Sequence, residues 1–228
     1  MANRAVLAVL LAGLAAAAYF FVISPRGDAP VPDAEVADIV APEVETAPET
    51  ETAPAPATGA VQGIGLEIDV TGAANGTIVI DLFEDVAPAH VAQITALAAE
   101  GAYDEVVFHR VIEGFMAQTG DVQFGRMGQD MRQAGMGGSD RPDLPLEASD
   151  ALSFERGTVG MARSQDPNSA NSQFFIMFAP ASHLDGGYTI VGKVVSGLDV
   201  LDAIKRGQGA NGAVIGAPDM MSAVRVIQ

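Results

Sequence analysis

The chain has 228 residues, of which 49% are hydrophobic, and a formal net charge of −17 at pH 7. The length suits one domain with extensions or two small domains. The negative charge argues against nucleic acid or an anionic membrane surface as a partner, because such binding needs basic surface. The chain contains no cysteine, which excludes disulfides, thiolate metal sites and a cysteine nucleophile.

The N-terminal end is almost wholly apolar. Residues 5–23 carry no charge and follow Arg4. As a helix they would span about 28 Å, close to the hydrocarbon thickness of a bilayer. Residues 19–23 extend the apolar run with aromatic side chains, which suit a membrane interface. We therefore predict that residues 1–24 form an uncleaved transmembrane anchor, with the bulk of the chain outside the cytoplasm.

A cleaved signal sequence is the alternative for this segment. Leu7 to Leu14 would form its short apolar core, and the small residues Ala16 and Ala18 would mark the cleavage site. In that case the rest of the chain would be secreted.

Residues 25–60 are rich in Ala, Pro, Glu and Thr, and after Arg26 they contain no basic and no aromatic residue. Such a stretch buries too little apolar surface to offset its ordering entropy. Frequent proline and like charge favour an extended chain. We predict a disordered acidic linker that acts as a spacer, followed by a folded domain over residues 61–228.

The folded domain begins with a predicted β-hairpin. Residues 64–70 and 77–83 are rich in apolar and β-branched side chains, and Asn75-Gly76 between them is a strong hairpin signal. Further strands are expected at residues 106–112, 157–162, 174–178, 189–195 and 222–227.

Two helices are expected as well. Pro88 opens a segment whose apolar residues fall on one helical face, and Gly101 stands where that helix would stop. Residues 198–204 form the second. Many short strands with two helices predict a closed β-barrel capped by helices rather than a parallel α/β sheet. Residues 125–150 are glycine-rich and aperiodic, and long loops of this kind are usually functional or mobile.

Two short stretches carry the chemistry of the chain. In residues 107–118, Arg110 is a permanent cation, Gln118 is an amide, and Phe115 and Met116 are apolar. In residues 171–175, Gln173 adds a second amide and Phe175 an aromatic ring. A few polar groups among apolar walls are typical of a small-ligand or peptide site. The stretches contain no obvious nucleophile, so a reaction here would proceed without a covalent intermediate. The residues concerned are Arg110, Phe115, Met116, Gln118, Gln173 and Phe175.

A set of motifs, in a fixed order, resembles one known family. The motifs are Phe108–Ile112, Gly114–Asp121, Ser172–Ile176, Leu184–Gly186 and Val191–Val194. Together they resemble the cyclophilin family of peptidyl-prolyl cis-trans isomerases. The resemblance runs from about residue 64 to the end of the chain, and it is the ordered combination that makes it specific.

The resemblance implies a closed, eight-stranded antiparallel β-barrel capped by two helices. It implies that the catalytic residues are Arg110, Phe115 and Gln118, of which Gln118 reaches the substrate backbone. Neither a metal nor a cofactor is implied. The substrate-binding residues that it implies, around the proline ring and along the groove beside it, are His109, Met116, Ala162, Arg163, Gln173, Phe175, His183, Leu184 and Tyr188.

Three positions depart from the pattern of many eukaryotic members. His183 stands where they have tryptophan, Tyr188 where they have histidine, and Arg163 where asparagine is frequent. The pattern looks like a bacterial-type variant. Because the tryptophan is a cyclosporin contact in the family, weak cyclosporin binding is expected. The motifs imply no partner subunit, so we expect a monomer. With the anchor, it would be a single-pass inner-membrane protein whose domain lies in the periplasm.

The chemistry of proline isomerisation explains these residue types. Amide resonance sets a barrier of about 18–20 kcal/mol to rotation, and uncatalysed exchange at an Xaa-Pro bond takes tens to hundreds of seconds. Rotation pyramidalises the prolyl nitrogen, so a guanidinium aimed at its emerging lone pair stabilises the twisted state more than the planar one. The residues thus predict a peptidyl-prolyl cis-trans isomerase that acts on unfolded or partly folded proteins and assists their folding.

A binding module is the alternative from another class. It would hold a proline-containing segment of a partner or act as a holdase, with turnover incidental, but a mere binder need not keep Arg110. A hydrolase is disfavoured because no Gly-x-Ser-x-Gly elbow is present. The three histidines, His90, His109 and His183, are too scattered to predict a metal site.

Overall fold

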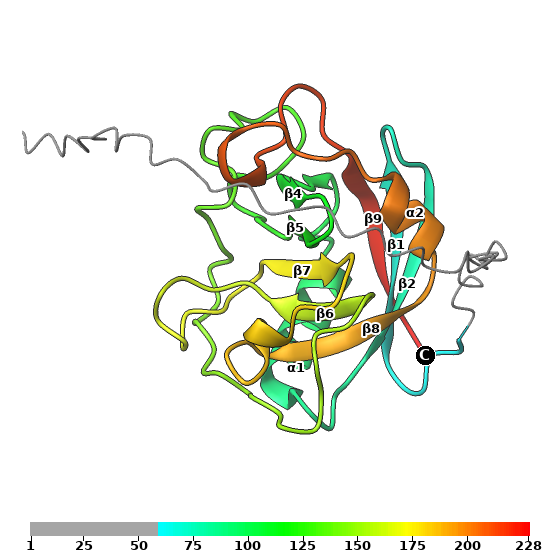
Figure 1. The fold of residues 1–228 in the computed structure, drawn as a ribbon, viewed down its shortest axis with the longest axis vertical. Coiled ribbons are helices and arrows are strands. Elements are labelled where there is room, and N and C mark those ends of the chain that lie inside the picture. Colours follow the sequence, from blue (N-terminus) through cyan, green and yellow to red (C-terminus); the bar gives the residue numbers. More distant parts are fainter. Residues whose placement is uncertain (1–58) are drawn as a thin grey trace, which may run out of the picture. The chain divides into compact units, whose positions relative to one another are not determined.

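The computed structural model describes residues 59–228. In this part of the chain nine strands form one sheet, with two α-helices and two 3₁₀ turns (Figure 1). The strands are β1 (Gly65–Thr71), β2 (Gly76–Leu82), β3 (Val106–Val107), β4 (Arg110–Ile112), β5 (Met116–Thr119), β6 (Thr158–Met161), β7 (Phe174–Met177), β8 (Ile190–Ser196) and β9 (Met220–Ile227). The helices are α1 (Pro88–Ala99) and α2 (Leu198–Ala203), and the 3₁₀ turns are η1 (Ser182–Leu184) and η2 (Ala210–Gly212).

All strand pairs are antiparallel, in the order β3-β9-β1-β2-β8-β6-β7-β5-β4. The predicted hairpin is confirmed, since β1 pairs with β2 and Val70 lies opposite Gly76. Along β1, Leu66, Ile68 and Val70 are buried while the residues between them are partly exposed, which is the period-2 pattern of a half-buried strand. The prediction of a mainly β domain with two helices is therefore confirmed.

The strand predicted at residues 106–112 is two strands in the structure. Val106 and Val107 pair with β9, whereas Arg110 to Ile112 pair with β5. The two residues between them bond elsewhere: the Phe108 N–H donates to the Asp219 carbonyl, and the His109 carbonyl accepts from the Val214 N–H. This change of partner raises the strand number to nine, against the eight that the resemblance implies.

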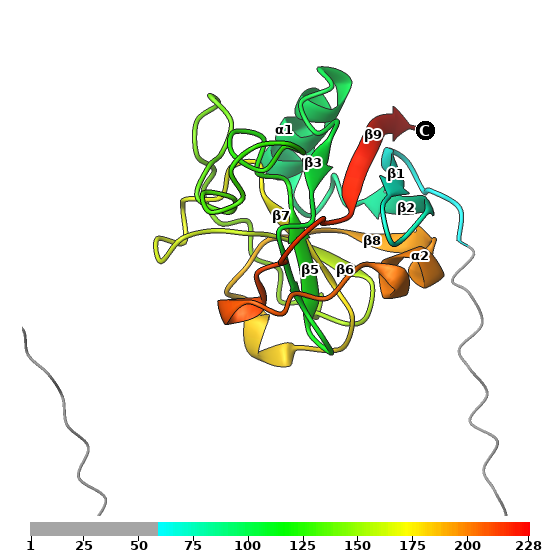
Figure 2. The same cartoon turned by 90° about the horizontal axis from the view of Figure 1, so that it is seen from above.

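Helix α1 follows the sequence prediction closely. It begins at Pro88, and Gly101 just after its end has a left-handed φ of 68°, a conformation that suits glycine at a helix stop. Its apolar face is buried, and it packs against β9, whereas α2 packs against β2 on another side of the sheet (Figure 2). The buried apolar residues of α1 are Val91, Ile94, Leu97 and Ala98.

The core has two parts. The larger combines the apolar faces of β1, β2 and α1 with Phe108 and Phe174. The smaller is built on Met116, Phe154 and Phe175. The smaller part forms the floor of the site described below.

The sequence did not predict one of the strands, β5. Met116–Thr119 forms β5, but its four residues show no alternation, and only its pairing with β4 and β7 makes it a strand. Residues 125–150 contain neither a helix nor a strand, as predicted.

The predicted anchor at residues 1–24 lies outside the described residues, and so does the predicted linker apart from Gly59 and Ala60. Gly59 is already attached to the sheet, because its N–H donates to the Val195 carbonyl at 2.8 Å. Within residues 59–228, none of the helices has the length and apolar character needed to cross a bilayer.

Candidate active site

A hollow of about 160 Å³ lies where the short strands meet the segment after η1. We call it the proline pocket, after the substrate ring that the family resemblance implies it would hold. Eight of the twelve predicted site residues line it. They are Arg110, Phe115, Gln118, Ala162, Arg163, Phe175, Leu184 and Tyr188.

The sheet register brings the central residues of this pocket into one row. Arg110 on β4 is paired with Gln118 on β5, which is paired with Phe175 on β7. Gly160 on β6 is the next residue in the row. A Cβ there would lie 2.5 Å from the Phe154 ring and 2.7 Å from the Phe175 ring, so glycine at this position lets the two rings fill the floor of the pocket.

The Arg110 guanidinium is held by two neighbours. Its Nε donates to the Asn211 carbonyl at 3.0 Å, and its Nη1 donates to Oε1 of Gln118 at 3.1 Å. A further bond joins Nη2 to Oδ1 of Asn211 at 3.3 Å. Burial lowers the pKa of Arg110, opposed by the nearby Tyr188, but an arginine stays charged at any physiological pH. A fixed cation thus faces an apolar hollow.

A chain of amide hydrogen bonds sets the orientation of Gln118. The Gly137 carbonyl can only accept, so Gln173 turns its Nε2 toward it at 2.7 Å. The Oε1 of Gln173 then accepts from Nε2 of Gln118 at 2.9 Å. The remaining oxygen of Gln118 faces Arg110, and its second N–H is left for a ligand.

Aromatic rings and one aliphatic side chain make the walls. Phe175 stacks on Phe154 with 5.6 Å between ring centroids and meets Tyr188 edge-on at 5.9 Å. At the rim His183 stacks on Phe115 at 5.9 Å. Such a surface accommodates a flat apolar ring. Met116 lies beneath the floor, almost fully buried, with its Sδ 4.0 Å from Nη1 of Arg110.

The segment that carries Leu184 and Tyr188 is tied down by a carboxylate. Both oxygens of Asp185 accept hydrogen bonds, from the Ser153 hydroxyl at 2.6 Å and from the Phe154 N–H at 2.8 Å. These two bonds, the hydroxyl first, lower the pKa of Asp185. They fix the rim of the pocket to its floor.

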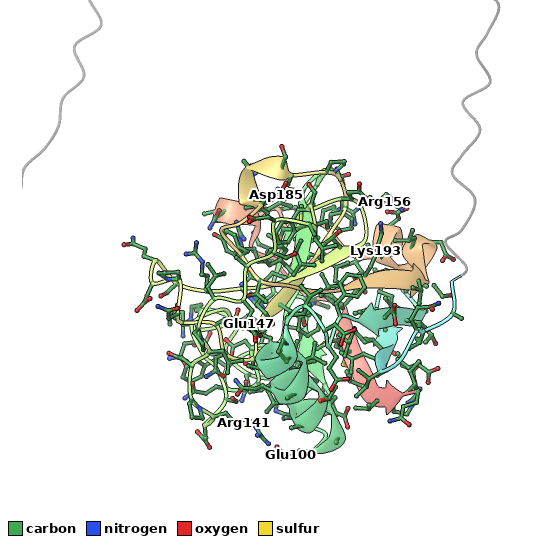
Figure 3. The ribbon with its side chains drawn as sticks, turned by 90° about the horizontal axis from the view of Figure 1, so that it is seen from below. Glu100, Arg141, Glu147, Arg156, Asp185 and Lys193 are labelled. Carbon is green, nitrogen blue, oxygen red and sulfur yellow. The ribbon has the colours of Figure 1, made fainter. Side chains whose placement is uncertain are left out.

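The long loop is attached to α1 at both ends of the helix (Figure 3). At the start, the Glu147 carboxylate accepts from the Ala89 and His90 N–H groups and from the His90 ring. Burial would raise the pKa of Glu147, but these hydrogen bonds outweigh it and lower the pKa. At the other end Arg141 pairs with Glu100. The carboxylate of Glu147 supplies the cap that α1 lacks within its own sequence.

His109 lies in a second hollow, of about 230 Å³, which it shares with Arg110, Gln118, Met136 and Asn211. Only 8% of the residue is exposed, and neither ring nitrogen finds a hydrogen-bond partner in the described part of the chain. Burial lowers the pKa of His109 to about 4. The ring is therefore neutral at pH 7, and it does not touch the proline pocket.

Comparison with known proteins decides the family. The family model described as "cyclophilin type peptidyl-prolyl cis-trans isomerase/CLD" matches residues 66–226. The chain belongs to the cyclophilin family. It is a peptidyl-prolyl cis-trans isomerase, an enzyme of a kind that needs no cofactor.

Curated relatives and solved structures agree. A "probable peptidyl-prolyl cis-trans isomerase" of Brucella suis biovar 1 (strain 1330) is 59% identical over 147 residues, 64% of this cyclophilin and 74% of the relative. Peptidyl-prolyl cis-trans isomerase B of Escherichia coli (strain K12) is 39% identical over 139 residues, 58% and 79% of the two chains. A Cryptosporidium parvum cyclophilin-type isomerase, crystallised in the presence of the dipeptide Ala-Pro, has a TM-score of 0.60 at 26% identity and covers 72% of this chain and 99% of its own.

The structure of this cyclophilin also shows site residues that the sequence motifs did not. Asn211 holds the guanidinium, and Gly137 orients the glutamine chain. Asp121, fully buried, accepts from the Gly137 N–H at 3.0 Å and so positions that glycine. Asn211-Gly212 is a residue pair typical of turns, but local spacing cannot predict that Asn211 contacts Arg110 or that Gly137 contacts Gln173.

Proposed function

We propose that Arg110, Phe115 and Gln118 carry out the isomerisation. The substrate proline ring occupies the proline pocket against Phe115 and Phe175, and the free N–H of Gln118 holds a backbone carbonyl. The guanidinium of Arg110 faces the prolyl nitrogen and stabilises its lone pair as the amide twists. Because the interaction exists only in the twisted state, it lowers the barrier rather than merely binding the substrate.

One observation carries this proposal. Arg110 has no carboxylate partner among residues 59–228, and neutral oxygens of Asn211 and Gln118 hold it at an apolar pocket. Its charge is therefore available to a ligand. The relative from Cryptosporidium parvum, crystallised with Ala-Pro, supports a proline-containing polypeptide as the substrate. Unfolded and partly folded proteins supply such segments in accessible form.

The test is Arg110→Ala in the full chain, assayed on a short Xaa-Pro peptide. We expect kcat/KM to fall about 10²–10³-fold, the size of effect seen when a preorganised transition-state donor is removed. The melting temperature should stay close to that of the wild type. Arg132→Ala is the matched control, because the Arg132 side chain is 89% exposed. Wild-type turnover in Arg110→Ala would refute the assigned mechanism.

We also propose that cyclosporin binds this cyclophilin weakly. His183, at the rim, offers a small ring where many relatives have tryptophan, and its ring is already stacked on Phe115. His183→Trp should therefore tighten inhibition by cyclosporin. Nanomolar inhibition of the wild type would contradict the proposal.

For the N-terminal part, we propose that residues 1–24 anchor the protein in the inner membrane. Residues 25–60 would then act as a spacer for a monomeric periplasmic domain over residues 61–228. N-terminal sequencing of the protein from the membrane fraction tests the anchor: a start at Met1 or Ala2 supports it, and a start near Tyr19 indicates cleavage. Sedimentation of the detergent-solubilised protein tests the monomer.

We propose further that β3 and β4 act as one bent strand, which would make a closed barrel of eight strands. The bonds of Phe108 and Val214 across the bend support this. Both amides should then exchange with solvent as slowly as those of the sheet, and fast exchange at either would argue for an open edge.

A further inference from the structure

The described part of the chain is acidic, with ten basic and twenty-one acidic residues after position 58. Six of the basic residues are paired with carboxylates. Of the other four, Arg126 and Lys205 donate to backbone carbonyls away from the site. The remaining two are Arg110 and Arg163, and both line the proline pocket. The surface around the proline pocket is therefore a cationic region on an otherwise acidic domain.

Arg163 is held rigidly without losing its charge. Its Nε and Nη2 donate to the Gly187 carbonyl at 3.1 and 2.9 Å, and its Nη1 donates to the Ser164 carbonyl at 2.8 Å. Its Cζ lies 4.3 Å from the centroid of the Tyr188 ring. All of these partners are neutral, and two of the five guanidinium N–H groups remain unused. A guanidinium held in this way can still pair with an incoming anion.

A third hollow adjoins the proline pocket on the Arg163 side. We call it the side hollow. Its volume is about 310 Å³, and it shares Gln118, Ala162 and Arg163 with the proline pocket. The residues that line it are Gln118, Gly135, Met136, Gly137, Ala162, Arg163, Ser164, Ser169, Asn171 and Gln173. None of them is acidic.

Three carboxylates near the side hollow are otherwise engaged. Asp121 is fully buried and accepts hydrogen bonds from the Gly135 and Gly137 N–H groups, two of the residues that line the hollow. Asp143 accepts from the side-chain amide of Asn171, and Asp166 accepts from the Asn168 N–H. None of the three forms an ion pair with Arg163.

A substrate whose proline fills the proline pocket has a neighbouring residue within reach of the side hollow, because the two share Gln118, Ala162 and Arg163. There that residue meets one unneutralised cation and several neutral polar groups.

We propose that Arg163 gives the side hollow a preference for an acidic side chain close to the substrate proline. The inference rests on the proposed isomerase mechanism and adds the class of substrate: Xaa-Pro segments flanked by Asp or Glu. The acidic surface elsewhere repels such segments, so the local cation decides whether they can enter. A lysine at the same substrate position meets Arg163 as a like charge and is disfavoured.

The experiment uses the full chain and short peptides with one Ala-Pro bond. Glu, Gln or Lys is placed either immediately before the alanine or immediately after the proline. We expect kcat/KM for the Glu peptide to exceed that for the Gln peptide about fivefold at one of the two positions, with Lys lowest. This is the range of a partly exposed ion pair. Raising the salt concentration to about 0.5 M should shrink the ratio, because screening acts on such pairs.

Three variants test whether Arg163 causes the difference in kcat/KM between the Glu and Gln peptides. In Arg163→Gln the Glu-to-Gln ratio should fall to about one, while Arg163→Lys should retain most of it because the charge is kept. Arg132→Gln changes the net charge equally at an exposed side chain outside the groove, and its ratio should equal that of the wild type. The ratio is the readout, since loss of the bonds to Gly187 lowers turnover of every peptide alike.

Two results would overturn the inference. Equal kcat/KM for Glu and Gln peptides at both positions in the wild type would remove the preference, and an unchanged ratio in Arg163→Gln would remove the role of Arg163. Either can occur while the neutral peptide is turned over normally, which leaves the isomerase mechanism intact. If the wild type did not turn over the neutral peptide, the mechanism would fail first, and this inference with it.

Discussion

The two halves of the sheet are built differently. Strands β1, β2, β8 and β9 have seven or eight residues each, and all four contribute buried side chains to the larger core. Strands β4 to β7 have three or four residues, and all but three of these are buried. The three half-buried residues are Arg110, Ile112 and Gln118. In the long-strand half, regular strand pairing determines the structure. The short-strand half instead exposes two polar side chains, Arg110 and Gln118, at the proline pocket.

The short-strand half relies on buried polar groups for its shape. Asp121 accepts four backbone N–H bonds, from residues 123, 124, 135 and 137, and forms no ion pair with any residue in the range 59–228. The Ser172 hydroxyl donates to the Gly120 carbonyl, and the Tyr103 hydroxyl donates to the Ser172 carbonyl. Buried groups of this kind are worth most when every one is satisfied. They hold the glycine-rich loop in the one conformation that orients Gln173 and Gln118.

A buried carboxylate in each half allows a direct comparison. Asp219 is as buried as Asp121, but it joins the β1–β2 turn to the end of α2 by accepting from the Ala74 and Lys205 N–H groups. Asp121→Asn and Asp219→Asn each turn an amide NH₂ toward backbone donors. Each should lower the free energy of unfolding by about 3 kcal/mol, measured by urea denaturation.

The two variants should differ in catalysis. Asp121→Asn should lower kcat/KM about tenfold in molecules that remain folded, because Gly137 no longer fixes the glutamine chain. Asp219→Asn should leave kcat/KM within about twofold of the wild type. If both variants lost activity equally, the two halves would not differ in their effect on catalysis, and Asp121 would have no positioning role.

The contrast between the long-strand and short-strand halves also explains which elements could be predicted from the sequence. The hairpin at Asn75-Gly76 and the helix from Pro88 to Gly101 follow from local periodicity and stop signals. Strand β5 and the break between β3 and β4 do not, because they depend on pairing with β7 and on the Asp219 carbonyl, more than fifty and one hundred positions away. In β6 and β7 every residue is buried, so no alternation marks which face lines the site.

The candidate site shows the same limit. Ordered motifs predicted the residues that line the proline pocket, but not how they are held. His109 was expected in the groove beside the proline pocket, and it lies in a hollow that shares Arg110 and Gln118 with that pocket. Asn211 holds the Arg110 guanidinium from η2, about one hundred positions later in the chain. Such partners depend on tertiary folding, so local sequence patterns do not reveal them.

His109 lies at the junction of the two halves, between β3 and β4, and its titration tests how tightly that junction is packed. Burial lowers the pKa from 6.5 to about 4. Between these values the unfolded chain binds a proton that the folded chain does not, so stability is complete above pH 6.5 and is lost as the pH falls toward 4. The loss from this group amounts to about 3 kcal/mol at most.

The measurement is the free energy of unfolding at pH 7 and pH 5 for the wild type and for His109→Phe. Phenylalanine sacrifices no hydrogen bond, because the histidine nitrogens have no partner in the described structure. Other groups that titrate in this range contribute equally to both proteins. The wild type should therefore lose more stability than the variant over this interval. Equal losses would mean that water reaches His109 and that the junction opens, in which case the halves move with respect to one another.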